Sequence, residues 1–244
     1  MRKVFCLLAM LLAGTAAAPA MAQGFTPQQR AEIVELVRAA LKSDPSILRD
    51  AIATLQEEET RQQQAAARTA IADLGDALTG TPGDPVEGNP QGDVTVVDFF
   101  DLRCPYCRRM LPVLAELLDH DRNLRIVHKD IPILGPGSLL GAKALLAAQK
   151  QGGYLTLKAA LMSGPAEITA ETLHAAAAKA GLDWNRLQQD MTEPSVQRRI
   201  DVNLGLAHKL DIEGTPAYVI GGQLLPGVVS LADLQSAVAE ARKK

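Results

Sequence analysis

The sequence has few cysteines, few aromatic residues and no long run of basic residues. Only 3 cysteines occur in 244 residues, which excludes a small domain held together by several disulfides. The formal net charge is −3, and without a basic tract nothing supports a nucleic-acid partner. No segment after the first 22 residues is apolar over a length that could span a membrane. The 47% hydrophobic content suits one medium domain and a smaller part.

Residues 1–22 have the pattern of a secretory signal peptide. Arg2 and Lys3 precede an apolar run over 4–18, and Ala20-Met21-Ala22 has the small–x–small form of a cleavage site. A lipoprotein signal would need a cysteine at its cleavage point, but Thr15 follows Leu-Ala-Gly. We therefore expect cleavage after residue 22 and a periplasmic location.

Cleavage changes the cysteine inventory. Cys6 leaves with the signal, so the mature chain keeps only Cys104 and Cys107, in a compartment where disulfides can persist. Losing two basic residues leaves 23 basic against 28 acidic residues. The loop that this pair closes is too short to staple a large fold.

Residues 23–78 are predicted to form a helical arm. Apolar residues recur at helical spacing near both ends, whereas LQEEETRQQQAAARTA between them is polar nearly all round. Such a helix cannot bury itself alone, so it packs on the main domain or on copies of itself. The segment 79–93, TGTPGDPVEGNPQGD, is predicted to be a linker, which favours self-association. The apolar positions are Ile33, Val34, Leu36, Val37, Leu41, Leu48, Ile52, Leu55, Ile71, Leu74 and Leu78.

Residues 94–244 are predicted to form an α/β domain. VTVVDFF (94–100) is apolar on both faces apart from two residues, which is typical of a central strand. A helix and a second strand (124–131) follow, then an alanine-rich helical block over about 137–210. Two short strands around Gly221-Gly222 and a last helix capped by Ser230 complete the order. The pattern predicts a sheet interrupted by a helical insertion.

The pair Cys104 and Cys107 could belong to a redox site or to half of a metal site. Structural zinc needs about four ligands, and the mature chain has no further cysteine. Two thiolates could instead hold Cu(I), which accepts low coordination numbers. The four histidines, each more typical of the surface or of a satisfied core position, show no ligand spacing: His120, His128, His174 and His208.

The position of the pair favours redox chemistry. A cysteine at a helix start faces unpaired backbone N–H groups and the positive end of the dipole, and both stabilise a thiolate. Cys104 is thus predicted to be the exposed attacking thiol, and Cys107 to resolve the mixed disulfide. Pro105 preorganises the first turn. Three arginines could add favourable charge or be ordinary solvated side chains: Arg103, Arg108 and Arg109.

Three motifs in order, VVDFFDLRCPYCRRM, PILGPGS and GTPAYVIGGQLLPG, resemble the DsbA family of exported thioredoxin-like thiol–disulfide oxidoreductases over about 85–242. The resemblance implies a thioredoxin-like fold with a helical insertion. It also implies an active-site loop that includes Pro105 and Tyr106, and a cis-proline at Pro216, after Thr215, beside the cysteines. Substrates would be exported proteins with cysteines, a membrane redox partner would reset the pair, and no cofactor is expected.

The helical arm is similar to that of suppressor of copper sensitivity C proteins, DsbA-like isomerases that oligomerise through N-terminal helices. The resemblance implies a homo-oligomer, with a trimer favoured over a dimer, and disulfide isomerisation. Pro105-Tyr106 replaces the Pro-His of strongly oxidising DsbA, which suggests a milder oxidant. Two alternatives stay open: a monomeric DsbA-like dithiol oxidase, and a copper-tolerance protein whose Cys104 and Cys107 bind Cu(I).

Overall fold

The computed structural model describes residues 25–243, so the predicted signal peptide over 1–22 lies outside the described residues. The chain divides into two units, one ending at Glu57 and the other beginning at Glu58. Within residues 25–243, no helix is both long and apolar enough to cross a membrane.

The N-terminal unit is helical. It holds α1 (Pro27–Ser43) and the first part of α2 (Ser46–Leu74). Thr26 caps α1, since its hydroxyl accepts the Gln29 N–H at 3.2 Å, and helix α1 buries no residue. The large apolar side chains of this unit are instead exposed: Phe25, Ile33, Val34, Leu36, Val37, Leu41, Ile47, Leu48, Ile52 and Leu55.

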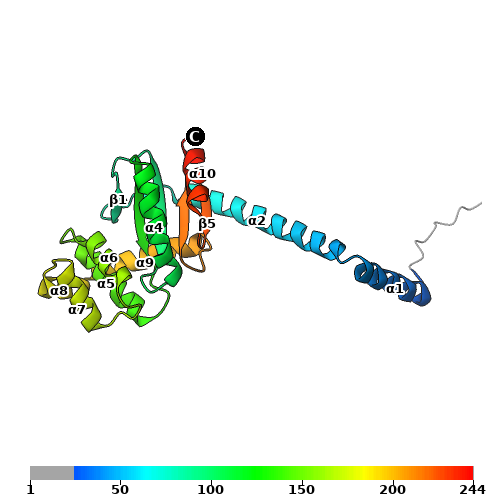
Figure 1. Ribbon diagram of the computed structural model, residues 1–244, viewed down its shortest axis with the longest axis horizontal. Coiled ribbons are helices and arrows are strands. Elements are labelled where there is room, and N and C mark those ends of the chain that lie inside the picture. The colour runs from blue at the N-terminus through cyan, green and yellow to red at the C-terminus, as the bar shows by residue number, and fades with distance from the viewer. Residues whose placement is uncertain (1–24, 244) are drawn as a thin grey trace, which may run out of the picture. The chain divides into compact units, whose positions relative to one another are not determined.

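The C-terminal unit is built on a five-stranded mixed sheet in the order β1-β3-β2-β4-β5 (Figure 1). The strands are β1 (Val86–Gly88), β2 (Val94–Phe100), β3 (Leu124–Asp130), β4 (Ala217–Ile220) and β5 (Gln223–Pro226). Strands β2 and β3 run parallel, with Asp98 opposite His128, and the other pairs are antiparallel. Strand β2 lies at the centre and is buried, as its apolar sequence predicts.

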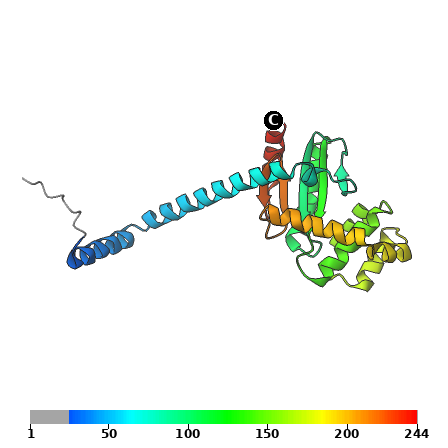
Figure 2. The same ribbon diagram turned by 180° about the vertical axis from the view of Figure 1, so that it is seen from behind.

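Helices cover both faces of this sheet. One face packs on α4 (Pro105–His120) and α10 (Leu231–Ala241), in front of the sheet in Figure 1. The other face packs on the end of α9 (Pro194–Lys209) and on α3 (Asp76–Thr79), seen from behind in Figure 2. Successive strand side chains point to opposite faces, so Val96 lies in the first core and Val97 in the second.

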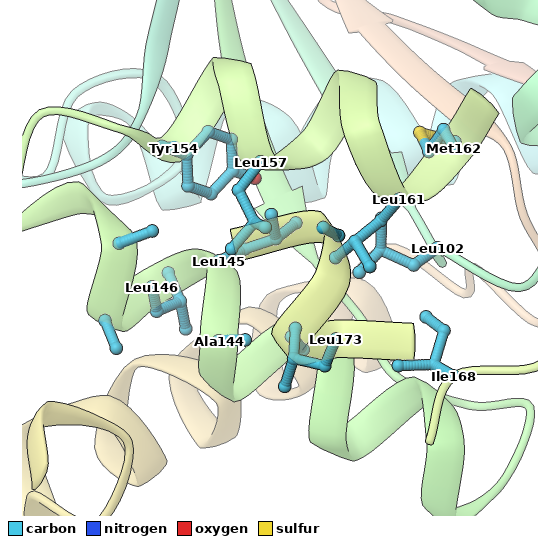
Figure 3. Close-up of a cluster of buried hydrophobic side chains, with 14 of the residues drawn as sticks. Leu102, Ala144, Leu145, Leu146, Tyr154, Leu157, Leu161, Met162, Ile168 and Leu173 are labelled. Carbon is cyan, nitrogen blue, oxygen red and sulfur yellow. The ribbon is translucent and has the colours of Figure 1, made fainter. Parts of the chain in front are cut away.

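The predicted insertion is the helical block α5 (Pro136–Gln149), α6 (Tyr154–Ser163), α7 (Ala170–Lys179), α8 (Trp184–Met191) and α9. It has its own apolar core, in which Leu145, Leu157 and Leu173 are fully buried (Figure 3). Gly141 lets α5 approach the loop before the cysteines, because a Cβ there would lie 2.6 Å from Leu102 Cδ1. The thioredoxin-like α/β fold with a helical insertion is confirmed.

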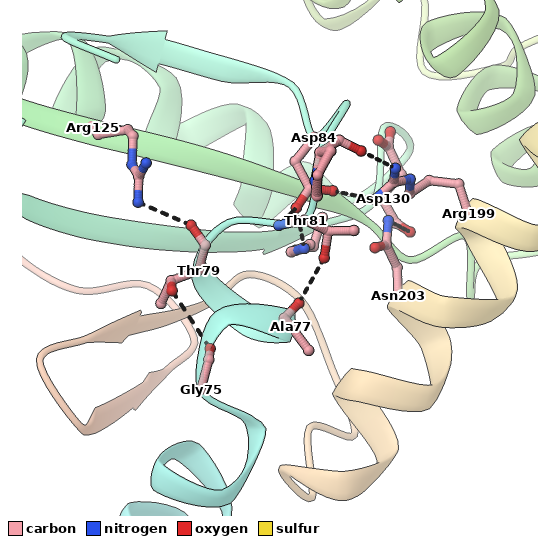
Figure 4. Close-up of polar contacts among 11 residues, drawn as sticks. Gly75, Ala77, Thr79, Thr81, Asp84, Arg125, Asp130, Arg199 and Asn203 are labelled. Carbon is pink, nitrogen blue, oxygen red and sulfur yellow. Dashed lines mark hydrogen bonds and ion pairs between the residues drawn. The ribbon is translucent and has the colours of Figure 1, made fainter. Parts of the chain in front are cut away.

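The boundary between the two units lies earlier in the chain than the predicted end of the helical arm at residue 78. The second unit already begins at Glu58, so the last turns of α2 belong to it, and Leu78 is fully buried. The segment 79–93, predicted to be a linker, contributes strand β1 and is fixed by polar contacts (Figure 4). Asp84 is buried and accepts Lys129 Nζ at 2.7 Å and Arg199 Nη1 at 2.8 Å. Proline and glycine content predicted a linker here but could not show these distant partners.

Candidate active site

The cysteine pair lies where β2 ends and α4 begins. Cys104 is the N-cap residue of α4, with Pro105 in the first turn, and Cys107 lies within that turn. Both thiols are free, and both residues are buried, with 3% and 4% of their surfaces exposed. The prediction that Cys104 is exposed is therefore wrong for this structure, because the loop before β4 covers it.

That covering loop carries the Thr215–Pro216 peptide bond, which is cis. Cys104 Sγ donates to the carbonyl oxygen of Thr215 at 3.2 Å, and Gly227 N donates to the carbonyl of Pro216 at 2.8 Å. The hairpin of β4 and β5 thus holds the proline loop against Cys104. Tyr106, between the cysteines, is half exposed at 53%.

Asp101 fixes the loop on the other side of the cysteines. Its two carboxylate oxygens accept the N–H groups of Arg103, Ile133 and Leu134 at 2.8–3.0 Å. They also accept the Ser138 hydroxyl at 2.8 Å. This buried carboxylate therefore ties the motif PILGPGS to the residue that precedes Cys104, and sequence reasoning did not single it out.

Two of the three arginines next to the cysteines donate hydrogen bonds to backbone carbonyl groups. Arg103 Nη1 donates to the carbonyl of Leu134 at 2.5 Å. Arg108 Nη1 donates to the carbonyls of Met162 and Gly164 at 2.8 and 2.7 Å. Arg108 thereby anchors the end of α6 to the helix that carries the cysteines. The third, Arg109, lies over the Tyr106 ring, 5.9 Å from its centroid.

A buried group of ionisable side chains lies next to Cys107. Asp98, Lys158 and His128 come from β2, α6 and β3, and each is at most 4% exposed. Lys158 Nζ lies 3.4 Å from Asp98 Oδ2 and 2.9 Å from His128 Nδ1. Burial opposes ionisation of Asp98, but Lys158 and His128 outweigh it and hold the carboxyl pKa below its usual value.

Cys107 shares a small cavity with two members of this group. Its lining includes Asp98, Lys158 and Tyr218. Burial raises the pKa of the Cys107 thiol well above its usual value, and the negative charge of Asp98 adds to the effect. Cys107 therefore stays protonated until a base takes its proton, which is the condition for a resolving cysteine that must wait for a mixed disulfide.

A family model described as the DSBA-like thioredoxin domain matches residues 95–239, more than half of the chain. The chain belongs to the DsbA-like thioredoxin family. A thioredoxin-like oxidoreductase from Silicibacter pomeroyi is 45% identical with a TM-score of 0.68, covering 69% of this chain and 98% of that one. ScsC of Proteus mirabilis in a transitional conformation is 32% identical with a TM-score of 0.66, covering 89% and 98%.

Curated relatives match only through part of their length. The Na(+)/H(+) antiporter NhaA 1 of Salinispora arenicola is 29% identical over 160 residues, which is 65% of this chain and 24% of the antiporter. The chain thus spans about a quarter of that relative. This partial match carries no argument about ion transport.

The structure brings together the predicted DsbA-like site residues, Cys104, Pro105, Cys107, Thr215 and Pro216, and leaves the side chain of Tyr106 exposed to solvent. It also reveals functional candidates that sequence reasoning missed, namely Asp98, Asp101, His128 and Lys158. Asp98 gave a signal, since it interrupts an otherwise apolar central strand. Lys158 gave no such signal, because it lies in the alanine-rich helical block, whose sequence does not show which residues face the cysteines.

Tyr154 packs in the core of the helical block and also makes a polar contact. It is buried in α6, and its hydroxyl donates to Asp130 Oδ2 at 2.8 Å. Within the described residues, Asp130 Oδ1 has no hydrogen-bond partner. Burial raises the Asp130 pKa to about 7, although the Tyr154 hydrogen bond acts in the opposite direction.

This raised pKa predicts that the free energy of unfolding falls as pH rises from about 4 to above 7. The folded state holds the Asp130 proton over that range while the unfolded state releases it, so ionisation destabilises the fold. Asp130→Asn should remove the dependence and stabilise the protein at pH 8 by up to about 4 kcal/mol, from about three pKa units. Urea unfolding at pH 4.5 and pH 8 measures this, with exposed Asp119→Asn as the control. Equal pH dependence in wild type and Asp130→Asn would contradict it.

Proposed function

We propose that the chain is a thiol–disulfide oxidoreductase acting on disulfides of exported proteins in the periplasm. The observation that carries the proposal is the placement of Cys104 at the N-cap of α4, against the Thr215 carbonyl, with Cys107 buried one turn further on. Unpaired N–H groups at this helix start favour the thiolate, which is the attacking species.

The exchange follows from the two cysteines. The Cys104 thiolate attacks one sulfur of a substrate disulfide, forms a mixed disulfide and releases the other substrate sulfur as a thiolate. Cys107 then loses its proton to Asp98, the buried carboxylate that shares its cavity. The Cys107 thiolate attacks Cys104 Sγ, so the cysteine pair is oxidised and the substrate leaves fully reduced.

Substrate polypeptide is proposed to bind beside the cis-proline loop. A groove of about 750 Å³ lies there, lined by Thr215, Pro216 and Gly227 on one side. Its other wall is the alanine-rich end of α2, at Ala66 and Ala70. Gln64 Nε2 donates to the carbonyl of Leu224 at 2.9 Å and holds this wall on the hairpin. Small side chains on the wall leave room for an extended chain next to Cys104.

The arm is proposed to assemble copies of the chain, with a trimer favoured and a dimer as the alternative. The support is the exposed apolar surface of the N-terminal unit, where Leu36 is 73% and Leu55 59% exposed, since such surface is normally covered in a soluble assembly. Several Cys104 thiols around one substrate would favour repeated attack on wrong disulfides, and thus isomerisation over simple oxidation. A membrane redox partner would reset the pair.

Deleting residues 23–57 is expected to give a monomer that still reduces insulin but refolds a scrambled-disulfide substrate at least about 10-fold more slowly, because the effective concentration of second thiols is lost. The deletion stops before Glu58 so that the second unit stays intact. Light scattering gives the mass, and recovery of substrate activity gives the isomerisation rate.

Two results would separate the alternatives for the arm. A monomeric full-length chain, or equal isomerisation by both forms, would favour the monomeric dithiol oxidase. Failure of the full-length chain to exchange any protein disulfide would contradict the enzymatic proposal itself. Assembly can be tested without deletion by Leu36→Lys, with Gln62→Lys outside the N-terminal unit as its control.

A further inference from the structure

We propose that His128 and Glu87 form the proton path of the resolving step. In this path the proton that Asp98 takes from Cys107 passes through the His128 imidazole to Glu87 at the protein surface. The inference rests on the proposed exchange at Cys104 and Cys107, and it adds strand β1 to the working parts of the site.

A path is needed because the base is sealed from solvent. Cys107 and Asp98 are 4% and 2% exposed, and the cavity they share is enclosed by Lys158, Tyr218 and apolar side chains. The Asp98 pKa is held low, so this carboxyl does not retain an acquired proton. Each turnover must therefore carry one proton out of a buried site.

The three side chains lie in a row across neighbouring strands. Asp98 on β2 is opposite His128 on β3, and Glu87 on β1 is opposite Ile126, one diagonal step from His128. Asp98 Oδ2 lies 3.0 Å from His128 Nδ1, and His128 Nε2 lies 3.0 Å from Glu87 Oε2. The His128 side chain is fully buried, whereas 36% of the Glu87 side chain is exposed. The row thus runs from the cavity to solvent.

The groups around His128 fit this role. Lys158 Nζ from α6 reaches both His128 Nδ1 and Asp98 Oδ2, and its charge favours release of the proton by Asp98. The Tyr154 ring stacks on the imidazole at 5.9 Å and the Phe100 ring meets it edge-on at 5.8 Å, which fixes its plane. The remaining titratable groups nearby come from three elements. Asp130 on β3 accepts a hydrogen bond from the Tyr154 hydroxyl, Tyr218 lies on β4, and the two cysteines lie at the start of α4.

The transfer balances without a further reactant. The Cys107 S–H proton moves to the Asp98 carboxylate, and the thiolate attacks Cys104 Sγ and displaces the substrate thiolate. Protonated Asp98 passes its proton to His128 Nδ1, while the Nε2–H proton moves to the Glu87 carboxylate and then to water. The displaced substrate thiolate takes a proton from water. When the redox partner reduces the pair, a proton moves inward along the same row and restores the first tautomer of His128.

Glu87→Gln tests the path because glutamine keeps an acceptor for His128 Nε2 but cannot take its proton. Reduced full-length protein is mixed with the aromatic disulfide 5,5′-dithiobis(2-nitrobenzoate) in a stopped-flow instrument. The first thionitrobenzoate is released by attack of Cys104 and the second by attack of Cys107. We expect Glu87→Gln to slow only the second release, by roughly 10-fold, less than the 10²–10⁴ typical of a direct general base.

The pH profile and a rescue separate proton transfer from a structural effect. The second release by Glu87→Gln should need a higher pH than that by wild type, and formate should restore part of the rate in Glu87→Ala. Lys129→Met is the matched control. Lys129 follows His128 on β3, and its replacement breaks the buried ion pair with Asp84 without removing any member of the row. It should leave the second release unchanged.

The possible outcomes separate the proton path from the attack by Cys104. An unchanged second release and pH profile in Glu87→Gln overturn the path, as does equal slowing of both releases or equal slowing by Lys129→Met. Slowing of the second release alone, with rescue by formate, supports it. Absence of the first release from wild-type protein would instead contradict the proposed attack by Cys104, so the two failures are distinguishable.

Discussion

Replacing Cys104 by serine is expected to abolish disulfide exchange, with at least about a 10³-fold loss of insulin reduction and of scrambled-substrate refolding. A serine hydroxyl fits the same N-cap position but does not supply the thiolate that attacks a disulfide. The free energy of unfolding should change little, because the substitution is nearly isosteric. The measurement is steady-state turnover of full-length protein with a dithiol reductant.

Controls separate the two cysteines. Cys107→Ser should still release the first thionitrobenzoate at the wild-type rate but should not release the second. Val202→Ser, at an exposed position of α9, should leave both steps unchanged. Retained turnover in Cys104→Ser, or loss of the first step in Cys107→Ser but not in Cys104→Ser, would contradict the assigned roles.

Replacing Lys158 by methionine is expected to lower the free energy of unfolding by about 3–5 kcal/mol at pH 7, because it leaves Asp98 as a buried carboxylate without its cation. The loss also removes the Nζ contact with the Phe100 ring, 4.3 Å from its centroid. Without Lys158 the Asp98 pKa should rise, so the destabilisation should grow as pH rises and shrink in acid. Guanidinium unfolding between pH 5 and pH 8 measures it.

The double variant Lys158→Met with Asp98→Asn provides the matched control. Removing both charges leaves no unpaired ion, so the double variant should be more stable than Lys158→Met alone. A loss below about 1 kcal/mol in Lys158→Met, or a double variant as unstable as the single one, would show that the pair is not coupled.

Local patterns predicted the parts of the fold that depend on neighbouring residues. The predicted cap at Ser230 is confirmed, because it depends on a hydrogen bond within one turn. The β4–β5 hairpin is also confirmed, and Gly221 and Gly222 both have positive φ, as its tight turn requires. The cis bond before Pro216 followed only from the family resemblance.

The features that sequence did not predict depend on distant contacts. His128 and Lys158 lie 30 and 60 positions after Asp98 in the sequence. Only the strand register and the packing of α6 bring the three side chains together. Cys104 is buried because Thr215, 111 positions away, lies against it. The boundary near Glu58 was hidden because it falls in the middle of α2, where the sequence is polar nearly all round.

The most direct test of the account is mass spectrometry of Cys107→Ser after incubation with a disulfide-containing substrate protein. Without the resolving thiol, the mixed disulfide cannot be released by the chain itself. We expect a one-to-one covalent adduct that maps to Cys104, is released by dithiothreitol and is missing in Cys104→Ser. No adduct, or an adduct that persists in Cys104→Ser with Cys107 intact, would contradict it.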